Sequence, residues 1–546
     1  MKFHELVKEN RLLGKALSSD EYKINVVSNV MVNPLKDLFE HSLRSRNINA
    51  SVHMGNYDNV IQDTVSCSEY STVLVIWELG NILNGFGFAV ESMTKEQRSS
   101  VVESMKSQID LCLLNLKNVP LVFVTEFSSA IFGQPSGRIS QIDGIARTLN
   151  EYLQGLASSN VMLLNVDKIM AHVGVANSYD MRFFYSSKAP YTIDYLEALI
   201  ARVTPAVLAN LGKAKKVLVL DCDNTLWSGV LGEDGTDGIK MSYDTGVGSI
   251  FADVQSFVGT LASQGVVICL CSKNNLADVQ DVIDHHPDMQ IGNDIVAVKK
   301  INWEDKASNI KAIANELNLG LDSVVFLDDS DFEVDLVASQ LPEVTVLQVP
   351  KKLYEYPNYL LHKSDLFFNP NLTNEDRSKS AIYRSQSERN TEKQKFTDIE
   401  DFLRSLEMEV SFRENASDSI QRIAQLTQKT NQFNLATERY SDGDIRRFTA
   451  DPNYKVISIN VSDKFGEQGL VGVVILHQKN DDITIDTFLM SCRVIGRNIE
   501  YVIMDHIVGL CRESGASSIY SSYHIPNFMF TIKYSSTITD NYISIM

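Results

Sequence analysis

The 546-residue chain is poor in cysteine, in long apolar runs and in positive charge, and each shortage excludes a class of protein. Its seven cysteines contain no Cys-x-x-Cys pair and follow no regular spacing, which argues against a disulfide scaffold and a structural zinc site. No apolar stretch approaches the roughly 18 residues that a membrane span requires. The charged, amphipathic N-terminal segment lacks the apolar core of a secretory signal. We therefore expect a cytoplasmic protein with reduced thiols and no membrane partner.

Basic residues are outnumbered, with 50 lysines and arginines against 69 aspartates and glutamates and a net charge of −19. Such a field repels phosphate backbones, and the aromatic residues are not interleaved with basic ones, so we expect no nucleic-acid partner. At roughly 100–200 residues per domain, the length corresponds to about three to five domains.

The pattern of apolar runs divides the chain into three blocks. In residues 1–205, short β-branched runs alternate with helical patterns, which predicts a parallel, doubly wound α/β sheet. Residues 206–352 repeat this alternation and form a second such domain. Residues 353–395 are polar and charged and predict an exposed helical linker, and residues 396–546 mix strands with a long helix, as in an α+β domain. The strands expected in the second block are 215–221, 265–272, 294–299, 322–329 and 343–349.

The strongest chemical signal follows the first strand of the second block. Asp221 and Asp223 stand there in the run Asp-Cys-Asp-Asn-Thr. Carboxyl ends of parallel strands form the functional edge of an open α/β sheet, so residues that follow later strands should meet this pair. Asp221 would attack phosphorus, and Asp223 would protonate the leaving oxygen and then activate water. A D-x-D triplet alone can also be a solvated acidic loop.

Polar residues in later parts of the block supply the rest of a phosphate site. Asp328 and Asp329 would join Asp221 and Asp223 as Mg²⁺ ligands, because this ion prefers a few carboxylates plus water and lets an anionic nucleophile approach a phosphate. The sequence leaves open which member of the 328–329 pair touches the metal. The predicted phosphate-binding residues are Thr225, Ser272, Lys273 and Lys306.

The strings around these residues resemble a known family. DCDNTLWSGVLGEDG (221–235), CSKNN (271–275) and W-x-x-K-x-x-N-I (303–310) are similar to the haloacid dehalogenase (HAD) superfamily of phosphatases, and specifically to its FkbH-like subgroup in subfamily IIIC. The resemblance covers nearly the whole chain. It implies an SGNH-like N-terminal domain, a HAD-like Rossmannoid domain and a GNAT-like C-terminal domain. It also implies an enzyme that takes a glyceryl unit from 1,3-bisphosphoglycerate, removes the remaining phosphate and loads the unit as a thioester onto an acyl carrier protein.

In the third block, Arg493, Gly496 and Arg497 resemble the phosphate-binding loop of GNAT-fold acyltransferases. This implies a site for phosphopantetheine on a carrier protein, or for CoA, held by arginines and by amides at a helix N-terminus. A positive loop would also suit an acidic carrier. The alternative is an ordinary turn into a core helix.

Transfer to a thiol suggests a cysteine thioester intermediate. Cys492 lies beside Arg493 at a predicted strand-to-helix turn, where a cation and a helix terminus favour the thiolate, so it is our first choice. Cys222, between two carboxylates, is the second choice, and direct transfer without a cysteine is a third. Asn431 and Asn434 would either orient the acyl group or serve as a helix cap and a surface amide.

In the first block, the hydrolase motif of SGNH proteins is incomplete. Ser28 and Gly80 follow predicted strands, but Asp167 has no histidine in the required register, since the next one is His172. We expect a noncatalytic scaffold or carrier-docking domain.

Three rival functions remain open. One is a HAD-type phosphatase of small molecules, and another is an acyltransferase that acts on a sugar amine in surface-polysaccharide biosynthesis. The third is a nonenzymatic scaffold for carrier docking. The expected partners are an acyl carrier protein and a small-molecule phosphate, and the sequence leaves the carrier, the final polyketide or polysaccharide product and the oligomeric state open.

Overall fold

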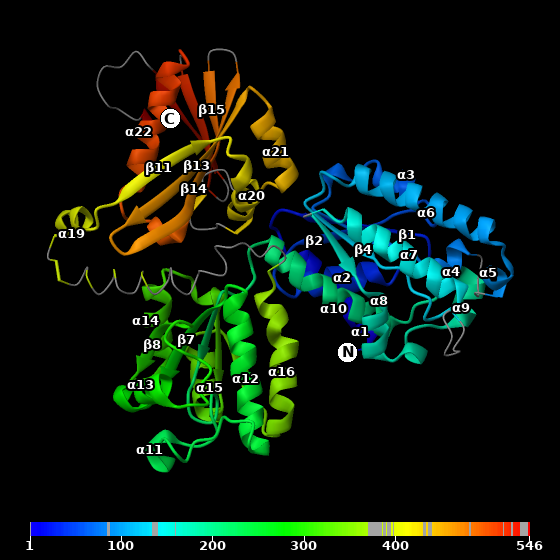
Figure 1. The fold of residues 1–546 in the computed structure, drawn as a ribbon. Helices are drawn as coiled ribbons and strands as arrows, with labels where there is room; N and C mark the ends of the chain where they lie inside the picture. Colours follow the sequence, from blue (N-terminus) through cyan, green and yellow to red (C-terminus); the bar gives the residue numbers. More distant parts are fainter. Residues whose placement is uncertain are drawn as a thin grey trace. The chain divides into compact units, whose positions relative to one another are not determined.

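A computed structural model shows two compact units, residues 1–210 with 440–444, and residues 211–439 with 445–546. The units are drawn together in Figure 1. Within the part of the chain that the structure describes, no helix is long and apolar enough to cross a membrane. The described residues are 2–83, 88–133, 140–158, 160–369, 385, 389, 392, 395–396, 398–429, 433–434, 439–479, 482–516, 518–525, 528–535 and 544–545.

The first unit is built on a five-stranded parallel sheet of order β2-β1-β3-β4-β5. The order reverses between β1 and β3, as in other doubly wound sheets. Nearly every residue of β1, β3 and β4 is buried, which explains their continuous apolar runs. The predicted parallel α/β arrangement is therefore confirmed. The strands are β1 Tyr22–Ser28, β2 Ala50–Met54, β3 Thr72–Ile76, β4 Leu121–Thr125 and β5 Val161–Leu164.

Helices connect these strands, and several begin at residues that cap them. Thr94 accepts a hydrogen bond from the amide of Gln97 at the start of α6, and Ser140 accepts one from Asp143 at the start of α7. The helices are α1 Phe3–Ala16, α2 Leu35–Arg44, α3 Val60–Thr64, α4 Leu79–Ile82, α5 Phe88–Ser92, α6 Lys95–Asn115, α7 Gln141–Leu156, α8 Val166–Val173, α9 Met181–Ser187 and α10 Ile193–Asn210.

The second parallel sheet has the order β10-β9-β6-β7-β8, so β6 lies at its centre. All five strands expected in this block are present. They are β6 Val217–Leu220, β7 Val267–Ser272, β8 Val296–Ile301, β9 Val324–Asp328 and β10 Thr345–Gln348. The helices around them are α11 Leu231–Asp234, α12 Gly246–Ser263, α13 Leu276–His285, α14 Lys306–Glu316, α15 Asp331–Gln340 and α16 Tyr356–Lys363.

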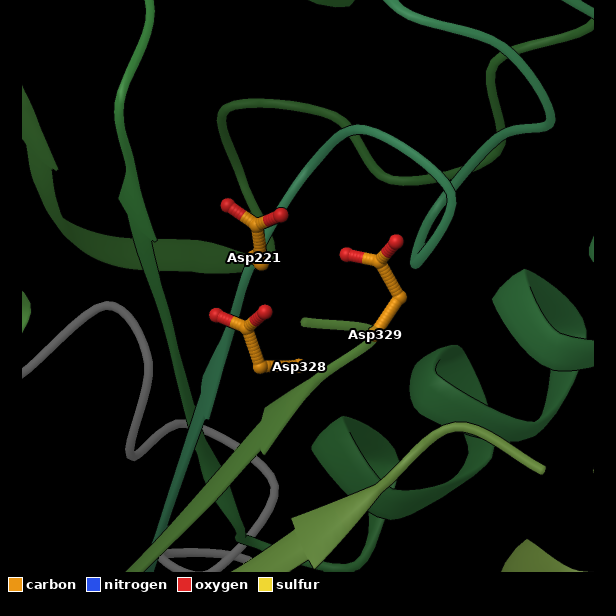
Figure 2. A group of neighbouring side chains, drawn as sticks. All are labelled: Asp221, Asp328 and Asp329. Atoms are coloured by element: carbon orange, nitrogen blue, oxygen red, sulfur yellow. The ribbon is translucent and has the colours of Figure 1, made fainter. Parts of the chain in front are cut away.

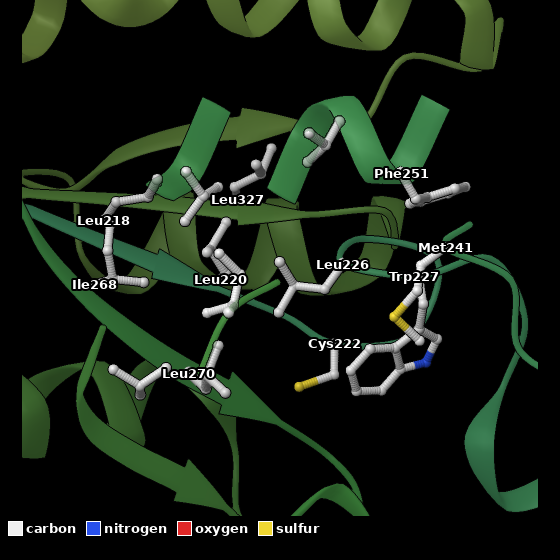
Figure 3. Packing of buried hydrophobic residues seen from close by; sticks show 14 of the residues in the cluster. Leu218, Leu220, Cys222, Leu226, Trp227, Met241, Phe251, Ile268, Leu270 and Leu327 are labelled. Carbon is white, nitrogen blue, oxygen red and sulfur yellow. The ribbon is translucent and has the colours of Figure 1, made fainter. Parts of the chain in front are cut away.

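Successive residues of β6 enter two different hydrophobic clusters, because side chains of a strand alternate between its faces. Val217 and Val219 pack on one face of the sheet. Leu218, Leu220 and Cys222 pack on the other, with the neighbours drawn in Figure 3. Packing on both faces therefore fixes β6 just before Asp221, the predicted nucleophile.

Residues after 353 do not all form an exposed linker. Tyr356 and Leu360 of α16, together with Phe367, belong to the same hydrophobic cluster as β6. The Tyr356 hydroxyl donates a hydrogen bond of 3.2 Å to the carbonyl oxygen of Thr225. The core of this domain therefore extends past the expected start of the linker.

The third sheet is mixed and has eight strands, with the order β11-β13-β14-β15-β16-β17-β18 and β12 paired to β15. Neighbouring strands are antiparallel except β15 and β16, which are parallel and joined through α22. This is the α+β arrangement expected for the block. The strands are β11 Glu409–Glu414, β12 Phe433–Asn434, β13 Tyr454–Asp463, β14 Gly466–Lys479, β15 Asp482–Met490, β16 Ser518–Ile525, β17 Phe528–Ser535 and β18 Ser544–Ile545, and the helices are α19 Ile399–Ser405, α20 Ile420–Lys429, α21 Asp442–Ala450 and α22 Ile499–Glu513.

Candidate functional site

Three carboxylates meet at the carboxyl edge of the second sheet. Asp221 follows β6, Asp328 ends the adjacent strand β9, and Asp329 comes next in the chain. One oxygen from each lies within 4.8 Å of the others, as the close-up in Figure 2 illustrates. A cluster of carboxylate oxygens of this size suits a divalent cation such as Mg²⁺.

Lys306, the first residue of α14, lies among these carboxylates. Its Nζ is 2.9 Å from Oδ1 of Asp221 and 2.5 Å from Oδ2 of Asp328, and all three side chains are at least nine-tenths buried. The helix begins here because the Asp305 side chain accepts a hydrogen bond from the Ser308 amide. Lys306 therefore supplies the positive charge that lets two carboxylates share a buried site.

Burial and charge shift the titration of these groups. Burial raises the pKa of Asp221 to about 7, with Asp328 adding to the rise and Lys306 opposing it. Burial alone would lower the pKa of Lys306, but Asp221 and Asp328 more than offset this and raise it above its usual value. The lysine is therefore held in its charged form, ready to attract an anion.

Three buried oxygen atoms around the edge make no hydrogen bond within the described part of the chain. They are Oδ1 of Asp221, which has only the ion pair with Lys306, Oγ1 of Thr225 and Oε2 of Glu333. For Thr225 and Glu333, whose oxygens lack even an ion pair, a buried polar atom left in this state costs about 1–3 kcal/mol. Unsatisfied oxygens beside a carboxylate cluster are what a site for Mg²⁺ and a phosphate ester requires, so the residues present fit that metal.

Asp223 is not brought into the carboxylate cluster. Its Oδ1 accepts hydrogen bonds from Nε1 of Trp227 (2.9 Å) and from the amide of Leu231 (3.0 Å). Its Oδ2 accepts one from Nδ2 of Asn274 (2.9 Å). The predicted metal role of this side chain therefore has no support in the geometry, whereas a carboxylate held in a fixed orientation beside Asp221 suits the predicted acid and base.

The predicted phosphate-binding residues divide into two groups. Ser272 is buried at the end of β7, next to the central strand, where its Oγ accepts a hydrogen bond of 3.2 Å from Asn274. Lys306 contacts Asp221 directly, and Ser272 also acts on the Asp221 carboxylate, lowering its pKa by hydrogen bonding. Lys273 instead forms an ion pair of 2.6 Å with Glu333. The sequence does not indicate this pairing, nor the hydrogen bond that Asn274 donates to Asp223.

The predicted loop of the third block lies between β15 and α22, but its arginines point into the domain. Nε of Arg493 donates to Oγ of Ser491 (3.0 Å), and its Nη1 donates to the carbonyl oxygen of Gln468 (2.8 Å). Nη1 of Arg497 lies 3.4 Å from Oδ2 of Asp463. Gly496, between them, is exposed and has a left-handed backbone with φ of 78°.

Of the two candidate cysteines, the structure describes the side chain of Cys222 but not that of Cys492. Cys222 is fully buried in the apolar cluster of Figure 3. Burial and the neighbouring Asp221 carboxylate raise the pKa of the Cys222 thiol well above its ordinary value, which disfavours the reactive thiolate. Cys492 begins a single 3₁₀ turn between β15 and α22, and its side chain lies outside the described residues.

The two asparagines expected near the acyl group are also unequal. Asn431 lies outside the described residues. Asn434 is on β12, where it pairs with Leu489 of β15. The structure thus brings this residue next to the strand that leads into the 491–498 loop.

Residues of the incomplete hydrolase motif in the first unit have local partners. Oγ of Ser28 accepts a hydrogen bond of 3.1 Å from the amide of Val30. The Asp167 carboxylate, at the start of α8, accepts one from the hydroxyl of Ser128, and His172 lies in the last turn of the same helix. The expectation of a noncatalytic domain stays a prediction.

Comparison with known proteins identifies a solved structure that is similar to much of the chain. No family model matches the chain, and no curated protein matches it. The N-terminal part of the protein BF1531 from Bacteroides fragilis, described as containing a phosphatase domain and complexed with Mg, has a TM-score of 0.60 and 25% identity. The match covers 68% of this chain and 100% of that one.

Two acetyltransferase structures match a much smaller part. The ribosomal-protein-S18-alanine N-acetyltransferase from Escherichia coli has a TM-score of 0.18 and 8% identity, over 22% of this chain and 70% of its own. The IAA acetyltransferase from Bacillus cereus has a TM-score of 0.17 and 14% identity, over 22% and 69%. Similarities of this size carry no argument about the third sheet.

Proposed function

We propose that the chain is a Mg²⁺-dependent bifunctional enzyme of the FkbH-like type, which loads a glyceryl unit from 1,3-bisphosphoglycerate onto an acyl carrier protein and removes the remaining phosphate. The observation that carries the phosphatase half is the cluster of Asp221, Asp328 and Asp329 around Lys306. The similarity to a solved structure that contains a phosphatase domain and Mg supports it. The SGNH-like first domain would serve as a scaffold or as a carrier-docking module.

In the phosphatase half, each residue has a role that follows from its place. Asp221, central on the edge, attacks phosphorus and forms an aspartyl phosphate as the P–O bond to the leaving group breaks. Asp223, oriented by Trp227 and Asn274, gives its proton to the leaving oxygen and takes one from the water that then hydrolyses the intermediate. Lys306 holds the phosphoryl oxygens by charge.

The metal would be held by Asp221, Asp328 and Asp329. When bound, Mg²⁺ offsets the repulsion between the attacking carboxylate and the anionic phosphate. Lys306 lies between Asp221 and Asp328 and offsets part of the repulsion between their carboxylates. Thr225 and Ser272 would donate hydroxyl hydrogen bonds to the phosphate, and the unsatisfied Oγ1 of Thr225 supports this role.

In the transferase half, the third domain would move the glyceryl group to the pantetheine thiol of the carrier. The parallel strands β15 and β16 are joined through α22, and the loop that contains Arg493 and Arg497 leads directly into this helix. This order of strand, loop, helix and strand supports the proposal. The acyl phosphate bond breaks as the thioester forms, and phosphate leaves. Cys492 would carry the acyl group between donor and carrier.

Intact-protein mass spectrometry tests both halves in one mixture of enzyme, Mg²⁺, freshly generated 1,3-bisphosphoglycerate and a holo carrier protein. We expect a glyceryl adduct on the carrier without residual phosphate. Asp221→Asn should leave a phosphorylated adduct or none, and the exposed Asp278→Asn on α13 is the matched control. Cys492→Ser should abolish the adduct and spare phosphate release. A carrier that stays unmodified under all conditions would reject the transferase half.

A second candidate, a plain phosphatase of small molecules, is favoured by one observation. Arg493 and Arg497 are engaged with groups of their own domain, as a purely structural loop would be. Under this alternative, Mg²⁺-dependent phosphate release persists with simple phosphomonoesters and Cys492→Ser has no effect on any activity. If no carrier adduct forms but a sugar amine becomes acylated, the polysaccharide alternative replaces both.

A further inference from the structure

The chain turns sharply after Asp221, and this turn carries two of the residues assigned to the phosphatase reaction. The amides of Thr225 and Leu226 both donate hydrogen bonds to the carbonyl oxygen of Cys222, at 3.2 and 2.8 Å. Asp223, the proposed acid and base, lies inside the turn. The positions of the Asp223 carboxylate and of the Thr225 hydroxyl therefore depend on the shape of this turn.

Two side chains from distant parts of the chain donate hydrogen bonds to successive carbonyl groups of the turn. The hydroxyl of Tyr356 donates to the carbonyl oxygen of Thr225 (3.2 Å), and Nε2 of Gln255 donates to that of Leu226 (2.8 Å). Both donors and both acceptor residues are completely buried. Because water does not reach such a place, removing either donor takes from a buried carbonyl oxygen a hydrogen bond that solvent cannot replace.

Each donor is itself held in place. Gln255 lies on α12, and its Oε1 accepts a hydrogen bond of 2.8 Å from the amide of Gln290. Tyr356 begins α16, which packs against α12 (Figure 1), and its ring meets that of Phe251 edge-on with centroids 6.2 Å apart. Burial raises the pKa of the Tyr356 hydroxyl well above its ordinary value, and neighbouring carboxylates, first Asp329, add to the rise. The hydroxyl therefore keeps the proton that it donates to the turn.

The same turn supplies the donors that orient Asp223. Trp227, whose Nε1 donates to Oδ1 of Asp223, directly follows Leu226, and the amide of Leu231 donates to the same oxygen. Leu226 and Trp227 pack with Phe251 in the cluster of Figure 3. A shift of the Leu226 carbonyl would therefore move the Trp227 donor as well. A misplacement of about 1 Å at a reacting group can lower a rate on the order of 10²-fold.

We propose that Tyr356 and Gln255 are positioning residues for the phosphatase reaction, because together they fix the turn that holds Asp223. They act through Asp223 and Thr225 rather than on the substrate. Tyr356 follows the last strand of the second sheet, so the segment after β10 becomes a working part of the phosphatase site. The effect on the reaction rests on the proposed phosphatase half, whereas the hold on the turn does not.

Hydrogen–deuterium exchange of the full-length chain tests the hold on the turn independently of activity. Tyr356→Phe keeps the ring in the apolar cluster and removes only the hydroxyl. We expect the amides of Thr225 and Leu226 to exchange roughly fivefold faster or more in this variant, because the turn opens more readily. The matched control is Tyr359→Phe, which removes a hydroxyl from the same helix beside the same cluster and should leave these amides unchanged.

The dependence on the leaving group separates positioning from general destabilisation. The alkoxide that leaves glycerol 3-phosphate needs a proton from Asp223, whereas p-nitrophenolate leaves without one. With Mg²⁺ present, Tyr356→Phe should therefore lower kcat/KM for glycerol 3-phosphate about tenfold more than for p-nitrophenyl phosphate. A smaller folded fraction would lower both values equally. Gln255→Met should change their ratio in the same direction, and Tyr359→Phe should leave it within about twofold.

Each outcome decides the proposal. Unchanged exchange at the turn in Tyr356→Phe, or equally faster exchange in Tyr359→Phe, overturns it. Faster exchange with equal losses for the two esters also overturns it, because the tyrosine then has a structural role alone. Faster exchange in Tyr356→Phe only, with the larger loss for glycerol 3-phosphate, supports it. If the wild type releases phosphate from neither ester, the proposed phosphatase half fails, and exchange alone decides whether Tyr356 holds the turn.

Discussion

Both five-stranded sheets of the chain bring buried polar residues to their carboxyl edges, but they satisfy them differently. In the first sheet, Asn29 exchanges hydrogen bonds with the backbone of Glu78 (2.7 and 3.0 Å), and the Glu78 carboxylate accepts from Gly80 (3.0 Å) and Tyr191. In the second, Oγ1 of Thr225 and Oε2 of Glu333 are buried without a hydrogen bond in the described part of the chain, and Oδ1 of Asp221 has only the ion pair with Lys306. Polar residues after a strand therefore mark a ligand site only where internal partners leave them unsatisfied.

The largest effect should come from Asp221→Asn. Loss of the nucleophile should reduce Mg²⁺-dependent phosphate release by at least about 10³-fold, as for other single catalytic groups. The corresponding change at the first edge, Asp167→Asn, should leave the rate within about twofold, since surface changes of this kind are nearly neutral. Colorimetric phosphate release with a phosphomonoester measures both. An equal loss of phosphate release in the two variants would contradict the view that the catalytic site lies at the edge of the second sheet alone.

Lys306→Met should destabilise the second sheet by about 3–5 kcal/mol, because it leaves Asp221 and Asp328 buried beside each other without a cation. Native-state hydrogen exchange of the β6 and β9 amides measures this loss. The exposed Lys311→Met on the same helix is the matched control. A stabilised variant would show that the lysine is replaceable by packing alone.

Trp227→Phe should lower kcat about tenfold with a smaller change in KM, because the Asp223 carboxylate loses its hydrogen bond from Nε1. Trp77, which is buried in the first unit and stacks on Phe127, provides the control variant Trp77→Phe. A loss of activity that is as large with Trp77→Phe would point to general destabilisation rather than to orientation of the acid and base.

The smallest effect should be on the pH dependence of the free energy of unfolding, through Glu78 at the carboxyl edge of the first sheet. Burial raises the pKa of Glu78, with the hydrogen bond from Tyr191 opposing, so its neutral form is favoured in the folded state. Its stabilising contribution is present below the ordinary glutamate pKa and is lost as pH rises through the raised value. Glu78→Gln should therefore make the free energy of unfolding fall less steeply as pH rises. Urea unfolding between pH 4 and pH 8 measures this slope. An unchanged slope would mean that Glu78 stays ionised.

Much of the second domain was predictable because its signals are local in sequence. The five strands are continuous apolar runs, and Asp221, Asp328 and Asp329 directly follow two of them, so the sheet topology alone brings them together. The short edge strand β2 is harder to predict, because Ala50–Met54 has five residues, two of them buried and the others partly or fully exposed.

Side-chain partners across the fold were less predictable. The roles of Asp223 at the metal and of Lys273 at the phosphate stay predictions, and spacing did not indicate their partners: Trp227 and Asn274 bond Asp223, and Glu333 pairs with Lys273. The partners come from other loops of the edge, and their orientation depends on packing that no spacing rule encodes. For the same reason, the sequence did not indicate that Arg389 contacts Asp463, which lies 74 positions away.

The division of β6 between two clusters has a consequence for insertions and deletions. Odd-numbered residues up to Val219 pack on one face and even-numbered residues up to Cys222 on the other, so parity decides which of the two faces a side chain enters. A single residue inserted between Val219 and Leu220 would shift the frame, turning the carboxylate of Asp221 toward the leucines and the thiol of Cys222 toward Lys306. Changes of length in β6 should therefore not be tolerated.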